Sequence, residues 1–177
     1  MAKLEIIMGN MFSGKTSLLI KRIKKHIFIG NKVLVINSRV DTRNISSVLQ
    51  THDKTTFECI KTNNLFEVST CIEYQSAKVI AIDEVQFFSN LRFFVEQALN
   101  DNKHIILSGL DGDYQQHVFG ELLSVIPLAD EVTKLSAMCM ECLDGTPGPF
   151  TKRIVDSCIQ ELVGDSNSYR AVCRSHL

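Results

Sequence analysis

The chain alternates short, largely apolar runs with polar or amphipathic stretches. Apolar runs at residues 4–8, 33–36, 79–82 and 104–107 are typical of buried strands, and residues 132–135 are expected to be one more strand. Residues 16–28 and 90–100 carry apolar positions at helical spacing, and Gly30 and Asn31 end the first of these helices. The order strand, loop, helix, strand predicts a parallel sheet with right-handed crossovers, and therefore an α/β fold.

Other intervals are less regular. Residues 37–53 are polar and weakly patterned, and we expect a mobile segment that reaches over a site. We expect a strand at residues 57–60, a short helix at 65–74, and a helix at 121–126 that ends at Pro127. From Ala137 onward the pattern changes to cysteine pairs, glycines and prolines. We therefore expect an α/β domain over residues 1–136 and a small second domain over residues 137–177.

Composition narrows the class of protein. Of 177 residues, 45% are hydrophobic and 22% are charged, which is ordinary for a soluble globular protein. The formal net charge is −1, whereas proteins that bind nucleic acid usually carry a basic excess, so no nucleic acid partner is expected. The start of the chain does not resemble a signal peptide, and no apolar stretch is long enough to span a membrane. We expect a cytoplasmic protein.

A glycine-rich loop follows the first strand. Its pattern is glycine, four other residues, glycine, lysine and threonine, which is that of a phosphate-binding P-loop. Glycines let backbone N–H groups point at phosphate oxygens, and the next helix offers its N-terminus to the same anion. Lysine then reaches the β- and γ-phosphates of ATP, and the threonine hydroxyl binds Mg²⁺. An ordinary glycine-rich turn is the alternative, but the flanking strand and helix favour an ATP site at Gly9, Asn10, Met11, Phe12, Ser13, Gly14, Lys15 and Thr16.

Two carboxylates, Asp83 and Glu84, end the apolar run at residues 79–82. A P-loop fold needs an aspartate beside its first strand to hold Mg²⁺, usually through water, and Asp83 suits that role. Glu84 is one residue further and is expected to point to the other side. There it can act as general base on water or on a substrate hydroxyl. Two solvated acids at a strand end are the alternative, which the P-loop disfavours.

Cysteines gather near the C-terminal end. Cys139 and Cys142 form a C-x-x-C pair, and Cys173 and His176 form a C-x-x-H pair. Two such pairs supply the four ligands of a tetrahedral structural zinc site. Cys158 lies between the pairs as an alternative ligand. Free thiols with a terminal histidine are the main alternative, and a redox pair is disfavoured because the C-x-x-C does not open a helix after a strand.

Several motifs occur in an order that resembles one protein family. They are Met11-Phe12-Ser13-Gly14-Lys15, Asp41-Thr42-Arg43, Thr51-His52-Asp53, Asp83-Glu84-Val85-Gln86-Phe87-Phe88, Leu110-Asp111-Gly112, Cys139-Met140-Glu141-Cys142, Thr151-Lys152-Arg153 and Tyr169-Arg170-Ala171-Val172-Cys173. Over nearly its whole length the chain is similar to thymidine kinases of the cellular and poxviral type. The resemblance implies a P-loop NTPase fold with a RecA-like parallel sheet and a small C-terminal zinc-ribbon or lasso domain.

The resemblance also implies residue roles. Glu84 matches the catalytic base, which takes the proton from the nucleoside 5′-hydroxyl. Residues matching the surroundings of the metal and phosphates are Asp41, Thr42, Arg43, Asp83 and Gln86. Those matching the walls of the base pocket are Met11, Phe87, Leu110, Tyr114 and Phe119. Those matching the lasso over the nucleoside are Gln160, Glu161, Leu162, Val163, Gly164 and Tyr169. Asn10 stands where the family commonly has proline, and His176 where many members have a fourth zinc-binding cysteine.

The implied reaction transfers the γ-phosphate of ATP to the 5′-hydroxyl of thymidine or deoxyuridine, which gives ADP and, from thymidine, dTMP for pyrimidine deoxynucleotide salvage. Mg²⁺, structural Zn²⁺, a homotetramer and feedback inhibition by dTTP are implied in the same way. A P-loop ATPase, in which Glu84 activates water, and a zinc-ribbon nucleic-acid module are the alternative functions. The net charge disfavours the second. The lasso with Tyr169 disfavours the first, because an ATPase does not need it.

Overall fold

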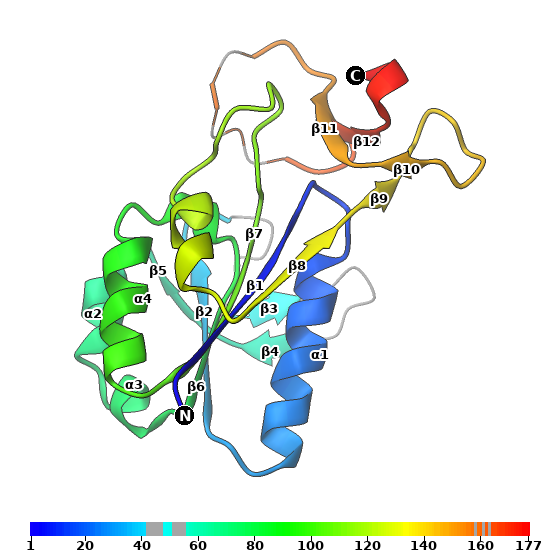
Figure 1. Ribbon diagram of the computed structural model, residues 1–177. Coiled ribbons are helices and arrows are strands. Elements are labelled where there is room, and N and C mark those ends of the chain that lie inside the picture. Colours follow the sequence, from blue (N-terminus) through cyan, green and yellow to red (C-terminus); the bar gives the residue numbers. More distant parts are fainter. Residues whose placement is uncertain (42–47, 51–55, 158, 161, 163) are drawn as a thin grey trace.

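A six-stranded sheet forms the centre of the molecule (Figure 1). The computed structural model describes the whole chain except residues 42–47, 51–55, 158, 161 and 163, and the side chains of residues 48, 50 and 56. The strands lie in the order β5-β2-β6-β7-β1-β8, and all neighbours are parallel. Their bounds are β1 (Lys3–Gly9), β2 (Val33–Ser38), β5 (Ile60–Thr62), β6 (Val79–Ile82), β7 (His104–Gly109) and β8 (Glu131–Leu135). The predicted parallel α/β fold is confirmed.

Helices cover both faces of this sheet (Figure 1). On one face, α1 (Lys15–Phe28) packs Leu19, Ile20 and Ile23 against strand residues such as Ile7. On the other face lie α2 (Leu65–Ser69), α3 (Ile72–Ser76), α4 (Leu91–Asn100) and the 3₁₀ helix η2 (Leu122–Leu128). Burial on both faces explains why the inner strands are nearly continuous apolar runs. None of the described helices combines the length and apolarity needed to cross a membrane.

Three predicted elements differ from the observed ones. The strand expected at residues 57–60 is two strands, because β4 (Thr56–Glu58) pairs with β3 (Val48–Gln50) and β5 then joins the main sheet. The helix expected at residues 65–74 is broken into α2 and α3. The Cys71 thiol caps α3 by accepting the Tyr74 N–H. Pro127 lies inside η2, which is 3₁₀ rather than α-helical.

Strand order and the interval at residues 37–53 also correct the prediction. Strand β7 lies between β6 and β1, so Asp83 does not end a strand that neighbours the first one. This order depends on non-local pairing, which the run of apolar residues does not specify. Residues 37–53 contain the end of β2 and all of β3, and the remainder of the expected mobile segment lies partly outside the described residues.

From Ala137 the chain leaves the main sheet and forms small antiparallel pairs. Strand β9 (Ala137–Met138) pairs with β10 (Pro147–Gly148), and β11 (Phe150–Arg153) pairs with β12 (Tyr169–Val172). The 3₁₀ helix η3 (Arg174–His176) follows. Figure 1 shows this unit beyond the carboxyl ends of β1 and β8. Its described residues contribute few fully buried apolar side chains, so apolar burial alone gives it little support.

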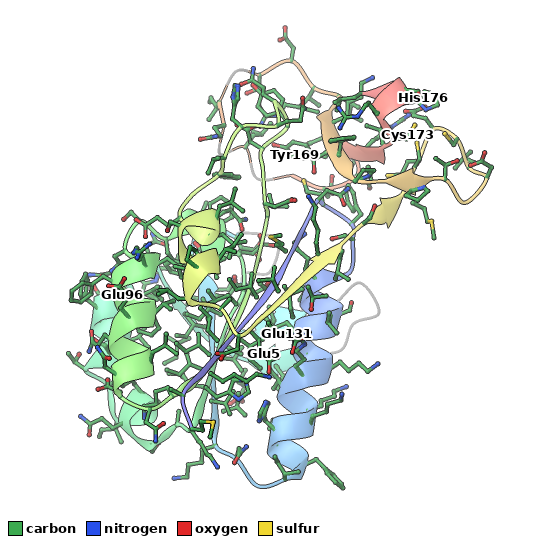
Figure 2. The ribbon with its side chains drawn as sticks, in the orientation of Figure 1. Glu5, Glu96, Glu131, Tyr169, Cys173 and His176 are labelled. Atoms are coloured by element: carbon green, nitrogen blue, oxygen red, sulfur yellow. The ribbon has the colours of Figure 1, made fainter. Side chains whose placement is uncertain are left out.

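A charged cluster ties β1 to α1 and β7. Glu5 on β1 is largely buried and receives Lys3 Nζ at 2.7 Å, the Arg22 guanidinium, and His104 Nε2 at 3.0 Å. Arg22 on α1 also reaches Glu131 Oε1 at 2.7 Å, and Figure 2 labels Glu5 and Glu131 on their neighbouring strands. The hydrogen bond from His104, followed by Lys3 and the charge of Arg22, holds the pKa of Glu5 well below its usual range.

We expect Glu5→Gln to lower the free energy of unfolding by about 3 kcal/mol at pH 7, because it removes the carboxylate from a buried ion pair. The folded-state pKa is depressed, so this contribution is fully present above the unfolded value of 4.5 and is lost as pH falls through the folded value. Urea unfolding at pH 7 and at about pH 3 measures the loss of stability and its dependence on pH.

The difference between wild type and Glu5→Gln should therefore shrink at the lower pH. Glu96→Gln is the matched control, since Glu96 pairs with Arg92 in an exposed i,i+4 bridge (labelled in Figure 2). It should change stability by less than about 1 kcal/mol. An equal loss for Glu5→Gln at both pH values would contradict the assignment.

Candidate active site

The glycine-rich loop joins the end of β1 to the start of α1. Gly9, Phe12 and Gly14 have φ angles of 148°, 64° and 82°. A Cβ at Gly9 would lie 2.2 Å from the carbonyl oxygen of Leu135, so a side chain there would collide with the end of β8. The loop is therefore pressed against the sheet while the N-terminus of α1 is presented at its far end. This combination of curled backbone and helix N-terminus is suited to binding phosphate.

Lys15, Thr16 and Asp83 meet at the carboxyl edge of the sheet. Lys15 Nζ donates to the carbonyl of Asn10 at 2.6 Å. Thr16 Oγ1 donates to Asp83 Oδ2 at 2.8 Å, and Ser108 Oγ from β7 donates to Asp83 Oδ1 at 2.5 Å. Asp83 is buried, which raises its pKa above the usual range, and the charge of Glu84 adds to that shift. A hydroxyl beside a carboxylate is a ligand set that Mg²⁺ accepts, and a bound cation would favour the charged carboxylate.

Glu84 has a strained backbone. Its φ of 52° is left-handed, which is uncommon for a residue with a side chain, and η1 (Val85–Phe87) begins immediately after it. Gln86 Nε2 donates to Glu84 Oε2 at 2.6 Å, and Gln86 Oε1 accepts the Leu110 N–H at 3.1 Å. A Cβ at Gly120 would lie 2.3 Å from the Gln86 carbonyl oxygen, so this turn is tightly enclosed. Gln86 thus connects the Glu84 carboxylate to the backbone of Leu110, the residue that follows β7, and so orients the carboxylate.

Other predicted residues lie around the same edge. Asp41 follows β2, is buried, and receives the side-chain amide of Asn37 at 3.1 Å. Lys61 Nζ donates to the Asp41 carbonyl at 3.0 Å. Thr42 and Arg43, predicted with Asp41, lie outside the described residues. Phe87 and Phe119 meet edge to face with ring centroids 5.6 Å apart, so two of the five predicted pocket walls are in contact.

Arg153, at the end of β11, organises the stretch that follows it. Its guanidinium lies 3.7 Å from the centroid of the Tyr114 ring, a stacking distance. It also donates at 2.7–3.2 Å to Tyr169 Oη and to the carbonyls of Ser157, Ile159 and Gln160. A planar cation with several donors can hold a run of carbonyls that has no regular secondary structure.

Two further bonds fix the predicted lasso. Tyr169 Oη donates to the Leu162 carbonyl at 2.6 Å, and Gln160 Nε2 donates to Asp113 Oδ2 at 2.6 Å. Figure 2 labels Tyr169 on the C-terminal unit, and its side chain is almost fully buried. A Cβ at Gly164 would come 2.7 Å from the Ser168 Cβ. Glu161 and Val163 lie outside the described residues.

The two cysteine motifs converge on one point, where Figure 2 labels Cys173 and His176. His176 Nδ1 lies 3.8 Å from Cys139 Sγ, 3.4 Å from Cys142 Sγ and 3.3 Å from Cys173 Sγ. The Sγ atoms of Cys142 and Cys173 are 3.7 Å apart. Tetrahedral zinc with bonds of about 2.0–2.3 Å separates its ligand atoms by about 3.5–3.8 Å, so the four residues fit this ion. Cys158, the alternative ligand, lies outside the described residues.

The sequence does not indicate the contacts that several residues of the site make. Ser108 follows the apolar run of β7, and a polar residue at a strand's carboxyl end was the available signal. Thr151 accepts the Met11 N–H at 3.1 Å, and in the sequence it stands out, like Arg153, only as part of a family motif. The Asn10 side chain donates to the Gly148 carbonyl at 2.8 Å. Asp113 and Asn10 carried no local pattern that indicated their partners.

Comparison with known proteins gives a consistent result. A family model described as thymidine kinase matches residues 2–177. The cytosolic thymidine kinase of Cricetulus griseus is 39% identical over 172 residues, 97% of this chain and 71% of that one. Thymidine kinase a of Arabidopsis thaliana is 42% identical, with 97% and 73% covered. The thymidine kinase of Myxoma virus (strain Uriarra) is 38% identical, with 97% and 94% covered.

Solved structures give a weaker likeness. Domain III of the Thermotoga maritima replication initiation protein DnaA superposes with a TM-score of 0.46 at 18% identity, over 75% of this chain and 54% of that chain. The family match and the identities over 97% of the sequence assign the chain on their own. The chain belongs to the thymidine kinase family.

Proposed function

We propose that this protein transfers the γ-phosphate of ATP to the 5′-hydroxyl of thymidine, or of deoxyuridine. The observation that carries the proposal is Glu84, held by Gln86 beside the Thr16–Asp83 pair, in a chain that belongs to the thymidine kinase family. An ATPase would use the same phosphate machinery. The Arg153-centred lasso favours the kinase, because hydrolysis of ATP does not require an ordered second substrate.

The glycine-rich loop would bind the phosphates of ATP. Its backbone N–H groups and the Lys15 ammonium would neutralise the phosphates, with Asp41, Thr42, Arg43 and Gln86 around them. Thr16 and Asp83 would hold Mg²⁺, either directly or through water, and the ion would neutralise charge on the transferred group. Met11 and Phe12 of the loop would then lie between the phosphates and the nucleoside. Much of the catalysis would then come from positioning and charge stabilisation.

Glu84 would act as general base. Its carboxylate needs to accept the proton of the 5′-hydroxyl while the oxygen attacks the γ-phosphorus. The bond from Gln86 Nε2 fixes the position of Oε2 in the Glu84 carboxylate. Because Gln86 is itself tied to the backbone of Leu110, the base has a fixed direction.

The lasso would hold the base of the nucleoside. Backbone groups of Gln160, Glu161, Leu162, Val163 and Gly164 would pair with the pyrimidine edge, with Tyr169 supporting them from behind. Met11, Phe87, Leu110, Tyr114 and Phe119 would supply the apolar walls. Backbone pairing of this kind rejects cytosine, whose donors and acceptors are reversed, at about 1–3 kcal/mol for each unpaired group.

We also propose roles for the two domains, an oligomeric state and a cellular location. Residues 1–136 would bind ATP and residues 137–177 would close over the nucleoside. A homotetramer inhibited by dTTP, working in the cytoplasm, is supported by family membership and by relatives named as cytosolic enzymes. The net charge of −1 supports small-molecule substrates over a nucleic acid partner.

The function is tested by measuring ADP formation from ATP with and without thymidine. We expect ADP formation to require thymidine, and Glu84→Gln to lower kcat by about 10²–10⁴-fold while the KM values for ATP and thymidine change little. Glu121→Gln, a change at a carboxylate that caps α4, is the matched control and should keep full turnover. ADP formation at the same rate without nucleoside would indicate an ATPase instead. Full turnover by Glu84→Gln would remove Glu84 as the base.

The Cys/His cluster predicts bound metal. We expect about one Zn²⁺ per chain after dialysis, measured by elemental analysis, because four preformed ligands bind zinc tightly. Cys142→Ser should lose most of that zinc and lower Tm, whereas Cys71→Ser, at a thiol outside the cluster, should keep it. Equal zinc content in the two variants would show that the metal sits elsewhere.

Arg153 should determine thymidine binding through the lasso. Arg153→Lys keeps the charge but loses the planar donor set, so we expect the KM for thymidine to rise about tenfold or more and the KM for ATP to stay within about twofold. Arg92→Lys is the matched control, because Arg92 also donates to a carbonyl, that of Ser124, but its side chain is exposed on the outer face of α4. A parallel rise of both KM values in Arg153→Lys would argue against a lasso-specific role.

A further inference from the structure

Asn10 of the phosphate loop reaches into the C-terminal unit. Its side chain is 2% exposed. Nδ2 donates to the carbonyls of Gly148 at 2.8 Å and Phe150 at 3.4 Å, and Oδ1 accepts the Ala137 N–H at 3.3 Å. These partners belong to β10, β11 and β9. One buried amide therefore bonds to three strands of the unit that carries the Cys/His cluster, and its donors and its acceptor are all used.

The backbone of Asn10 contacts the phosphate machinery instead. Its carbonyl accepts Lys15 Nζ at 2.6 Å and Ser13 Oγ at 2.8 Å. The same residue thus holds the lysine with its main chain and the C-terminal unit with its side chain. A displacement of β9 or β10 would pull on the amide and move the carbonyl to which Lys15 is bonded.

Strands β9 and β10 are in turn tied to the metal cluster. Gly148 pairs with Ala137, and a Cβ at Gly148 would lie 2.8 Å from the Cα of Cys139, so the two backbones are in close contact. The Cys139 N–H also donates to the Thr146 carbonyl at 2.8 Å. The β9–β10 hairpin, which carries Cys139 and Cys142 of the cluster, is therefore the same hairpin to which the Asn10 side chain is hydrogen-bonded. With little apolar burial, its position depends on the metal held by those ligands.

We propose that Asn10 is a positioning residue that couples metal binding at the Cys/His cluster to ATP binding at the phosphate loop. With metal present, the β9–β10 hairpin holds the Asn10 amide, and Asn10 holds the loop in its phosphate-binding shape. Without metal the hairpin loosens and the loop loses that support. The inference rests on the proposed function in one respect, that ATP is the ligand of the loop.

The test measures ATP binding rather than turnover. Calorimetry gives the Kd for ATP with Mg²⁺, without nucleoside, on zinc-loaded protein and on protein dialysed against a chelator. In wild type we expect metal removal to weaken ATP binding by about 5–30-fold, within the usual range of coupling between two sites. In Asn10→Ala, zinc-loaded protein should already bind ATP weakly, and metal removal should change the Kd by less than about twofold, since coupled effects are not additive.

Two further variants complete the design. Asn31→Ala is the matched control. Asn31 follows the C-terminal end of α1, far from the phosphate loop in sequence, and its side-chain amide contacts His26. The Kd of this variant for ATP should respond to metal removal as that of wild type does. Asn10→Asp keeps the shape and the acceptor but loses both donations, and should behave as Asn10→Ala. It decides the question if circular dichroism shows that the alanine variant fails to fold.

Reciprocity supplies a second measurement. If metal strengthens ATP binding by a given factor, ATP must strengthen zinc binding by the same factor, which competition with a chelating dye measures. A wild-type Kd for ATP that ignores metal, or an Asn10 variant with the full metal response, would overturn the inference. Neither assay contains thymidine, so the coupling between metal and ATP is measured independently of the reaction. A protein that shows this coupling but does not phosphorylate thymidine would contradict the proposed function and leave the coupling supported.

Discussion

The buried carboxylate of Asp83 is the constraint around which the rest of the site is arranged. A charged group inside a protein is costly unless hydrogen bonds or a cation compensate for lost water. Asp83 obtains these bonds from Thr16 at the start of α1 and from Ser108 at the end of β7. Its partners therefore fix how α1 sits over the sheet. Burial still raises the pKa of Asp83, and a bound divalent cation would offset that cost by favouring the charged carboxylate. Stability and the proposed Mg²⁺ binding would therefore depend on the same carboxylate oxygens.

Parallel strands make this arrangement accessible. Their carboxyl ends lie on one edge, so β1, β6 and β7 deliver the phosphate loop, the two acids and the Gln86–Leu110 contact to the same place. Strand β7 separates β1 from β6, so Ser108 on β7 can donate to Asp83 Oδ1 while Thr16 donates to Oδ2. An aspartate on a strand directly beside β1 would have no such neighbour between it and the loop.

Much of this was predictable because it is local. The phosphate loop, the acid pair and the cysteine pairs are short patterns whose chemistry follows from spacing. The apolar runs predicted the strands for the same reason. Strand order and the pairing of β5 with β2 were not predictable, since both depend on partners far away in sequence. The break at Cys71 is local, but a cysteine thiol is an unusual helix cap and gave no recognisable signal. Arg153 shows the limit clearly: its stacking partner Tyr114 lies in a loop after β7, and nothing in the sequence near either residue indicates the pair. Asn10 has the same limitation, since its partners begin at Ala137.

Strand β11 links the C-terminal unit, which has little core of its own, to the phosphate loop and to the lasso. Side chains alternate along a strand, so Thr151 and Arg153 share one face and Phe150 and Lys152 share the other. The first face bonds to the Met11 N–H and to the lasso carbonyls.

The second face of β11 meets the helix that carries His176. Lys152 Nζ donates to the His176 carbonyl at 2.8 Å, and the Phe150 ring lies 4.6 Å from the Arg174 guanidinium. Four residues therefore connect the phosphate loop, the lasso and the metal cluster. A movement of η3 would therefore reach β11 through Lys152 and Phe150, and through β11 the phosphate loop and the lasso. The metal would therefore act on catalysis by fixing the position of one short strand, without touching either substrate.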